Sequence, residues 1–236
     1  MQPLPVRLSV ILPVLAEKES LAQLVGCLHE LADEVLHEIL VIVAPGSPAD
    51  TREICARTAR RFPTVRMLEQ DHNPGVGLAL RQGIAAATGT HILLMDSDGE
   101  MDVGTVPSML AALERTGADM VIGSRWVRGG GVEGYGRLKY VLNRGFQVIF
   151  RVLYRTSVRD LTLGFKLARA EVLKSFEWTS QFQDMGCETT VRPIRAGYRV
   201  TEVPTVWRCR TEGSSNNPLR RNFKYVKVAL SVLAGS

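Results

Sequence analysis

Four carboxylate residues follow a short apolar run in the segment LLMDSDGEMD, residues 93–102. Asp96, Asp98, Glu100 and Asp102 occupy alternate positions, so their like charges repel one another unless a cation lies between them. Hard divalent cations such as Mg²⁺ and Mn²⁺ prefer oxygen ligands and usually bridge protein carboxylates to substrate phosphates. The spacing therefore indicates a metal site for a phosphorylated substrate. A turn or a helix N-cap is the alternative, because Asp and Ser are common in both.

The elements that would position these residues alternate between strand-like and helix-like patterns. Predicted strands cover residues 7–14, 37–44, 65–70, 91–98 and 118–125, and predicted helices cover 19–35, 48–62, 76–88 and about 104–116. This alternation predicts an α/β fold with a doubly wound, mostly parallel sheet and helices on both faces. Ligands of such sheets bind outside the carboxyl ends of the strands, where the acidic segment would lie.

The composition limits the classes of protein that this chain can belong to. It has 236 residues, of which 45% are hydrophobic and 22% charged, which suffices for a large core and excludes a disordered chain. The net charge is +5, and Lys and Arg are concentrated in the second half, which suits phosphate groups. The four cysteines show no paired spacing, so we expect reduced thiols and no zinc. No apolar run approaches the roughly 18 residues of a membrane-spanning helix, and no signal peptide is expected.

Five segments, taken in order, resemble family-2 inverting glycosyltransferases, most closely the dolichol- or polyprenyl-phosphate mannosyltransferase branch. They are VILPVLAEKESL, GVGLALRQGIAAATGTHILLMDSD, MVIGSRWVRGGGVEGYGRLKYVLNRG, RDLTLGFKLARAEVL and GYRVTEVPTVWRCRTEGSS. The resemblance implies a GT-A-like, nucleotide-diphospho-sugar transferase fold and a reaction that depends on Mg²⁺ or Mn²⁺. It also implies a nucleotide-sugar donor, GDP-mannose by default, and a polyprenyl- or dolichyl-phosphate acceptor.

The resemblance assigns roles to individual residues. Asp96 and Asp98 stand at the family's metal-binding pair, and Glu100 stands at a further ligand position. The residues expected to bind the donor and its metal are Pro13, Glu17, Gly46, Asp71, Gly75, Asp96, Ser97, Arg128 and Ser215. For Asp71, a turn is the plainer interpretation.

The loop after the second predicted strand departs from the family pattern. The family usually has an acidic pair before Gly-Ser, whereas this chain has Ala44-Pro45-Gly46-Ser47. Alanine and proline offer no side-chain acceptor, so recognition of the base or ribose must differ. The identity of the donor therefore stays open.

The residues expected to carry the chemistry depend on the acceptor. A lipid phosphate is already anionic and needs no strong base, so Arg125, Arg210 and Arg128 would position phosphates while Asp98 holds the metal. A sugar hydroxyl would need a carboxylate base, for which Asp184 and Glu188 are the candidates. Helix capping, or an i,i+4 ion pair of Glu188 with Arg192, is the alternative for these two carboxylates.

Two segments, 138–155 and 219–233, combine apolar residues at helical spacing with Lys and Arg. Each could pack on the core or lie at a membrane interface. We therefore expect a glycosyltransferase domain at 1–218, a basic amphipathic helix at 219–236, and a peripheral location at the cytoplasmic membrane face. Nucleic acid is not an expected partner, because no stacking aromatic residues accompany the basic residues of the predicted loops.

Two other functions fit the same motifs. The fold could glycosylate a soluble or polysaccharide acceptor, with Asp184 or Glu188 as base. It could also be a non-catalytic nucleotide-sugar-binding subunit, for which Ala44-Pro45 is the support, although the retained DSD motif and both arginine-containing loops oppose it.

Overall fold

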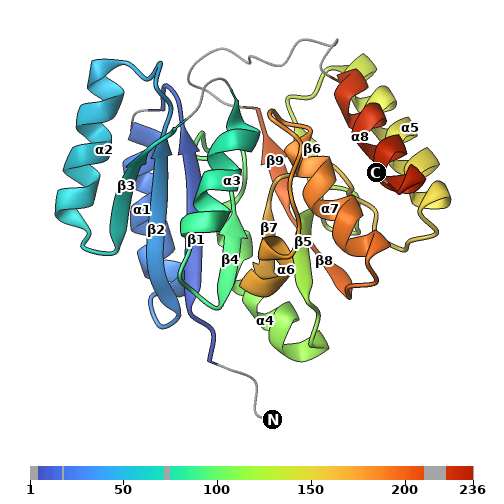
Figure 1. Cartoon of the computed structure of the whole chain (residues 1–236), viewed down its shortest axis with the longest axis horizontal. Helices are drawn as coiled ribbons and strands as arrows, with labels where there is room; N and C mark the ends of the chain where they lie inside the picture. Colours follow the sequence, from blue (N-terminus) through green and yellow to red (C-terminus); the bar gives the residue numbers. More distant parts are fainter. Residues whose placement is uncertain (1–4, 18, 72–74, 210–221, 236) are drawn as a thin grey trace.

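The computed structural model describes residues 5–17, 19–71, 75–209 and 222–235, and its main feature is a seven-stranded sheet with helices on both faces (Figure 1). The strands are β1 (Leu8–Val14), β2 (Leu36–Val43), β3 (Val65–Glu69), β4 (His91–Leu94), β5 (Met120–Ser124), β6 (Gly131–Glu133), β7 (Lys166–Arg169), β8 (Val200–Pro204) and β9 (Val206–Arg208). The α-helices are α1 (Glu19–Ala32), α2 (Ala49–Arg61), α3 (Val76–Ala86), α4 (Val106–Thr116), α5 (Arg137–Leu153), α6 (Ala170–Lys174), α7 (Met185–Arg195) and α8 (Asn222–Ala234). A 3₁₀ turn, Val103–Thr105, precedes α4.

The sheet has the strand order β3-β2-β1-β4-β7-β5-β8. All neighbouring pairs are parallel except those made by β7, which is antiparallel to both β4 and β5. The predicted doubly wound, mostly parallel sheet is confirmed. Successive strands extend to opposite sides of the β1–β4 pair, so a ligand crevice is expected at the carboxyl ends of these two strands.

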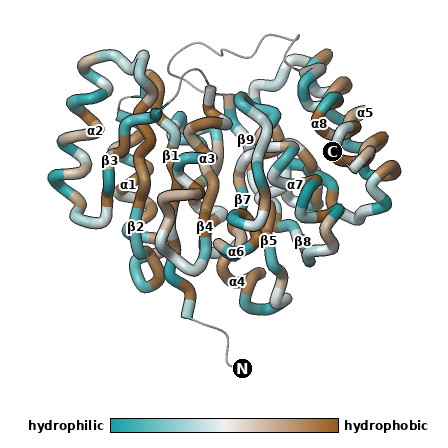
Figure 2. The backbone as a smooth tube through the Cα atoms, viewed as in Figure 1, coloured by the Kyte–Doolittle hydropathy of each residue, from teal (hydrophilic) through white to brown (hydrophobic). Residues whose placement is uncertain are grey.

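The core lies on both faces of the central strands because successive strand residues point to opposite sides. Val10 and Leu12 of β1 belong to the cluster with α1 and α4, whereas Ile11 belongs to the cluster with α3, α6 and α7. Figure 2 shows brown colouring along these central strands, whereas α2 at the edge is mainly teal and white. Strands buried on both faces read as continuous apolar runs, which is why the sequence revealed them.

Several strands differ from the sequence-based expectation. The fourth strand ends at Leu94 and not at residue 98, so the acidic segment lies in the loop that follows. Strand β7 was not predicted, and neither was the short parallel pair of β6 and β9. These strands have three or four residues, too few to show a periodic pattern.

The two amphipathic segments form α5 and α8, which lie side by side at one end of the molecule (Figure 1). The Tyr154 hydroxyl donates to the Ala229 carbonyl at 2.8 Å, and the rings of Phe146 and Tyr225 are 6.3 Å apart. Ala229 and Val232 are buried, so α8 packs on the same core as α5 and α7. The predicted domain boundary at 218/219 lies outside the described residues.

Candidate active site

The acidic loop after β4 is held in place by short polar contacts. The Ser97 hydroxyl donates to the Pro13 carbonyl at 2.5 Å and thereby joins the loop to the end of β1. The Glu100 amide donates to Asp98 Oδ1 at 3.0 Å, and Trp207 Nε1 donates to Glu100 Oε2 at 3.1 Å. The loop therefore keeps its shape at the crevice between β1 and β4.

The carboxylate oxygens that this loop offers as ligands suit a hard divalent cation. Asp96 and Glu100 line the same cavity, and Asp98 lies between them in the chain. Within residues 5–17, 19–71, 75–209 and 222–235, no three His, Cys, Asp or Glu side chains converge as a complete metal site. Mg²⁺ commonly takes only one or two protein carboxylates and completes its shell with waters and substrate phosphates. The residues present fit that kind of site.

A cavity of about 760 Å³ extends from the acidic loop along α5. Its charged and polar lining residues include Asp96, Glu100, Arg125, Lys139, Asn143 and Thr162. Its apolar lining residues on α5 and α8 include Leu142, Phe146, Ile149, Leu153, Val226 and Leu230. Lys139 and Leu153 are 14 positions apart on α5, which corresponds to about 21 Å along a helix. The cavity therefore begins beside charged groups and continues along an apolar wall.

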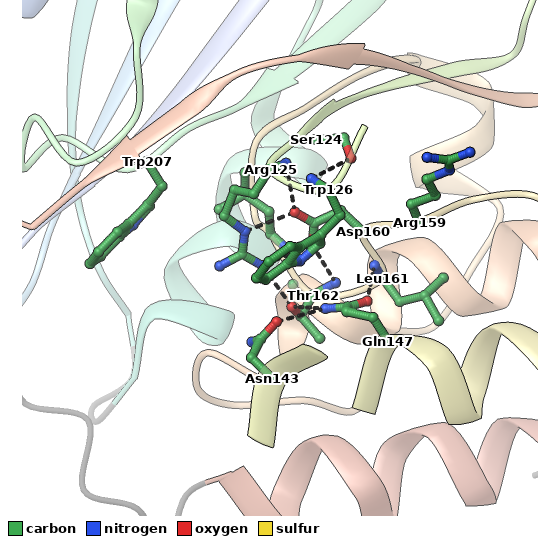
Figure 3. Close-up of polar contacts among 12 residues, drawn as sticks. Ser124, Arg125, Trp126, Asn143, Gln147, Arg159, Asp160, Leu161, Thr162 and Trp207 are labelled. Atoms are coloured by element: carbon green, nitrogen blue, oxygen red, sulfur yellow. Dashed lines mark hydrogen bonds and ion pairs between the residues drawn. The ribbon is translucent and has the colours of Figure 1, made fainter. Parts of the chain in front are cut away.

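Arg125 forms a buried ion pair with Asp160 at the polar end of this cavity (Figure 3). Its Nε and Nη2 atoms donate to the two carboxylate oxygens at 2.8 Å each, and Nη2 also donates to Thr162 Oγ1 at 2.9 Å. Burial alone would lower the pKa of Arg125 and raise that of Asp160. The opposite charge of the partner outweighs this effect in each case, so the pKa of Arg125 is raised and that of Asp160 is lowered. Both groups therefore stay charged, and Nη1, which has a 3.5 Å contact with the Tyr135 hydroxyl, keeps a second N–H for a ligand.

Gln147 joins α5 to the loop that carries Asp160 (Figure 3). Its amide nitrogen donates to Asn143 Oδ1 at 3.1 Å and to Thr162 Oγ1 at 2.8 Å, and its amide oxygen accepts the Leu161 N–H at 2.7 Å. The side chain is almost fully buried. The polar end of the cavity is therefore a connected network, which the sequence did not reveal because its members are distant in the chain.

Glu188 and Asp184, the two candidate bases, do not line the cavity. Glu188 is fully buried, and its carboxylate accepts hydrogen bonds from the Ser180 N–H at 2.7 Å and from Arg192 Nε at 2.8 Å. Burial would raise the pKa of Glu188, but these hydrogen bonds lower it. The predicted i,i+4 ion pair with Arg192 is confirmed. Asp184 stands at the start of α7 and accepts the Phe182 N–H at 3.1 Å.

The residues predicted at the nucleotide lie in loops at the carboxyl edge. Glu17 Oε2 accepts the N–H groups of Leu15 and Ala16, at 2.6 and 2.9 Å, and so shapes the loop after β1. Gly75 has φ +135°, and a Cβ there would lie 2.0 Å from the Gln181 carbonyl oxygen, so no larger residue fits. Asp71 stands in an exposed bend.

The remaining predicted site residues are exposed or lie outside the described part of the chain. Gly46 and Arg128 are both exposed. Arg210 and Ser215 lie outside the described residues.

Arg52 organises the loop that lacks the expected acidic pair. Its guanidinium donates to the carbonyls of Ala44, Pro45 and Ser47 at 3.1 to 3.2 Å. Its Nη1 also donates to both carboxylate oxygens of Glu69, at 2.6 and 2.8 Å. The sequence did not indicate that Arg52 organises this loop, because the residue lies inside a predicted helix. The backbone of the loop is thus fixed by α2 and β3.

Comparisons with known proteins give consistent results. Residues 9–176 match the family described as Glycosyl transferase family 2. A "Polyprenol monophosphomannose synthase" of Mycolicibacterium smegmatis is 31% identical over 216 residues, 89% of this chain and 80% of that protein. A "Dolichol-phosphate mannosyltransferase" of Pyrococcus furiosus is 26% identical over 225 residues, 94% of this chain and 62% of that protein.

Solved structures resemble the whole chain in fold. Glucosyl-3-phosphoglycerate synthase of Mycobacterium tuberculosis, in complex with phosphoglyceric acid, superposes with a TM-score of 0.74 at 20% identity, covering 97% of this chain and 80% of that one. A complex of that enzyme with Mn²⁺, UDP and phosphoglyceric acid gives a TM-score of 0.72 at 20% identity, covering 98% and 78%. These matches confirm the predicted fold class.

Proposed function

Since the chain belongs to glycosyl transferase family 2, we propose that it transfers a mannosyl group from a nucleotide diphosphate sugar to a polyprenyl phosphate. The names of the polyprenol- and dolichol-phosphate relatives support this acceptor. The chain spans 62% of the length of the Pyrococcus relative and 80% of the Mycolicibacterium one. The observation that carries the proposal is the cavity that joins the acidic loop to basic groups and to an apolar wall.

The donor diphosphate belongs at the acidic loop. Asp96 and Asp98 would hold Mg²⁺ or Mn²⁺, with Glu100 beside them, and the Mn²⁺–UDP complex of the structurally similar synthase supports the use of a divalent ion with the donor. Such an ion neutralises the diphosphate and makes it a better leaving group. The nucleoside would then extend over the ends of β1 and β2, toward the loop that Arg52 fixes. GDP-mannose is the default donor.

The acceptor phosphate belongs at the polar end of the cavity. Arg125 and Lys139 provide positive charge there, and Asn143 provides an amide. A phosphate oxygen of the acceptor attacks the anomeric carbon as the bond from that carbon to the donor diphosphate breaks, and the configuration inverts. The attacking oxygen is already anionic, so positioning by these residues is their main contribution. The isoprenoid chain would follow Phe146, Ile149 and Leu153 along α5.

Helix α5 also carries an exposed apolar stripe. Seven large hydrophobic side chains on it are 49% to 69% exposed: Leu138, Val141, Leu142, Val148, Ile149, Val152 and Leu153. They recur at intervals of three and four residues, and Arg137, Arg144 and Arg151 form a basic row beside them. Such a helix suits the membrane interface, with apolar groups in the acyl region and arginines at the headgroups. Among the described helices none has the length and apolarity to span a membrane.

If α5 lies on the membrane, the cavity is brought to the polyprenyl phosphate acceptor in the bilayer. Leu142, Ile149 and Leu153 belong both to the exposed stripe and to the cavity lining. A lipid could therefore pass from the bilayer along α5 without crossing water. We propose the cytoplasmic membrane face as the site of action, because nucleotide sugars are the donors.

A donor and acceptor panel tests the proposed function. The protein is incubated with Mg²⁺ and radiolabelled GDP-mannose, GDP-glucose or UDP-glucose, each with undecaprenyl phosphate or with 3-phosphoglyceric acid. We expect label in the organic phase with undecaprenyl phosphate, and most of it from the mannosyl donor. Label found only in a water-soluble product would contradict the lipid acceptor.

A further inference from the structure

Lys166, the first residue of β7, carries a fully buried ammonium group. It pairs with Leu94 of β4 on one side and with Ile122 of β5 on the other, so it lies between the two strands that lead to Asp96 and Arg125. Its Nζ donates to the carbonyl oxygens of Leu163 at 2.5 Å and Gly186 at 2.8 Å. Across the described part of the chain, no carboxylate forms an ion pair with it.

Both carbonyl groups that Lys166 binds belong to residues that line the cavity. The two segments touch closely there, since a Cβ on Gly186 would lie 2.6 Å from the Thr162 carbonyl oxygen. Leu163 is also tied to Asp160, whose Oδ1 accepts the Leu163 N–H at 3.2 Å. Lys166 therefore fixes the segment that orients Arg125 through Asp160 and Thr162.

The buried charges around Lys166 do not balance. When Lys166 is protonated, it and Arg125 contribute two positive charges, and the buried Asp160 contributes one negative charge. Cys187 cannot compensate, because burial raises the pKa of its thiol to about 12. The charge of Asp96, the predicted metal ligand, also acts on Lys166. Burial lowers the pKa of Lys166 to about 7, although Asp160, Cys187 and Asp96 oppose this effect.

A buried positive charge that has carbonyl partners but no carboxylate ion pair is costly, and an anion in the adjacent cavity would offset that cost. We propose that Lys166 is a positioning residue for the acceptor phosphate: it holds the Leu163 and Gly186 segments together, and its charge attracts the phosphate toward Arg125. This inference rests on the proposed function and adds a residue that makes no direct contact with the reacting atoms.

The test compares Lys166→Met and Lys166→Arg with a matched control, Lys174→Met. Lys174 also donates its Nζ to a backbone carbonyl, that of Ala87 at 2.6 Å, but Ala87 does not line the cavity, whereas Leu163 and Gly186 do. The measurements are the KM for a short-chain polyprenyl phosphate, the KM for the nucleotide sugar, and the Kd for the matching neutral polyprenol.

The Met variant should raise the acceptor KM by about tenfold or more, as expected for loss of a charged partner, and leave the donor KM within about twofold. The Arg variant should recover most of this loss, and the polyprenol Kd should stay unchanged. The Lys174→Met control should behave as wild type. If Lys166→Met does not fold by circular dichroism, Lys166→Gln, which keeps a donor without the charge, takes its place.

Two results overturn the inference in different ways. A folded, uncharged variant with an unchanged acceptor KM, or with equal losses for phosphate and polyprenol, rejects the role of Lys166 while the proposed function stands. A wild-type protein that neither binds nor glycosylates the polyprenyl phosphate rejects both.

Discussion

At the scale of single residues, the sequence located the acidic loop but not the contacts behind it. Asp96, Asp98 and Glu100 could be placed because they follow an apolar strand directly. The partnership of Arg125 with Asp160 spans 35 positions and depends on β7 and its preceding loop, which no local pattern revealed. Lys166 was hidden for the same reason, since a lysine in a short strand reads as a surface residue.

The Arg125–Asp160 pair gives a prediction about stability. Asp160→Asn should lower the free energy of unfolding by about 3–5 kcal/mol, because it leaves a buried guanidinium without its countercharge. Urea unfolding measures this loss. Glu133→Gln is the control: its exposed pair with Arg208 should contribute less than about 1 kcal/mol. Equal, small effects of both substitutions would show that the buried pair does not hold the site together.

At the scale of elements, strands and helices with clear periodicity were predicted, and short or irregular ones were not. The apolar runs of β1 and β2 and the 3.6-residue pattern of α1 and α3 are strong signals. Strand β7 has four residues and runs antiparallel, and neither its existence nor its direction follows from an apolar pattern. The sequence pattern of α5 showed both apolar and basic residues. Only the structure distinguishes its buried face, which carries Gln147 and Phe150, from its exposed stripe.

The exposed stripe of α5 gives a prediction about membrane binding. Replacing Val141, Val148 and Val152 together by Ser should reduce co-sedimentation with vesicles of phosphatidylcholine and phosphatidylglycerol severalfold, because apolar area no longer enters the bilayer. These three residues do not line the cavity, so activity on a detergent-solubilised acceptor should persist. Leu31→Ser, an exposed position on α1, is the control. Undiminished vesicle binding by the triple variant would exclude the α5 stripe as the docking face.

At the scale of the whole molecule, the function depends on how the sheet brings distant segments to one edge. The β1–β4 crevice holds the acidic loop. Strand β7 carries Lys166, and Arg125 directly follows β5. Helices α5 and α8 then extend the site with an apolar wall. The sequence predicted the parallel sheet and its ligand-binding edge. The cavity could not be predicted, because it forms from α5, α8 and the start of α7, whose relative positions depend on tertiary packing.

The most direct test of the account is the transfer of labelled mannose to undecaprenyl phosphate by wild type and by Asp98→Ala, each with Mn²⁺ or with EDTA. We predict organic-phase label only for wild type with Mn²⁺, while circular dichroism shows that the variant is folded. Full transfer by Asp98→Ala in EDTA would contradict the claim that a divalent ion at the acidic loop activates the sugar donor.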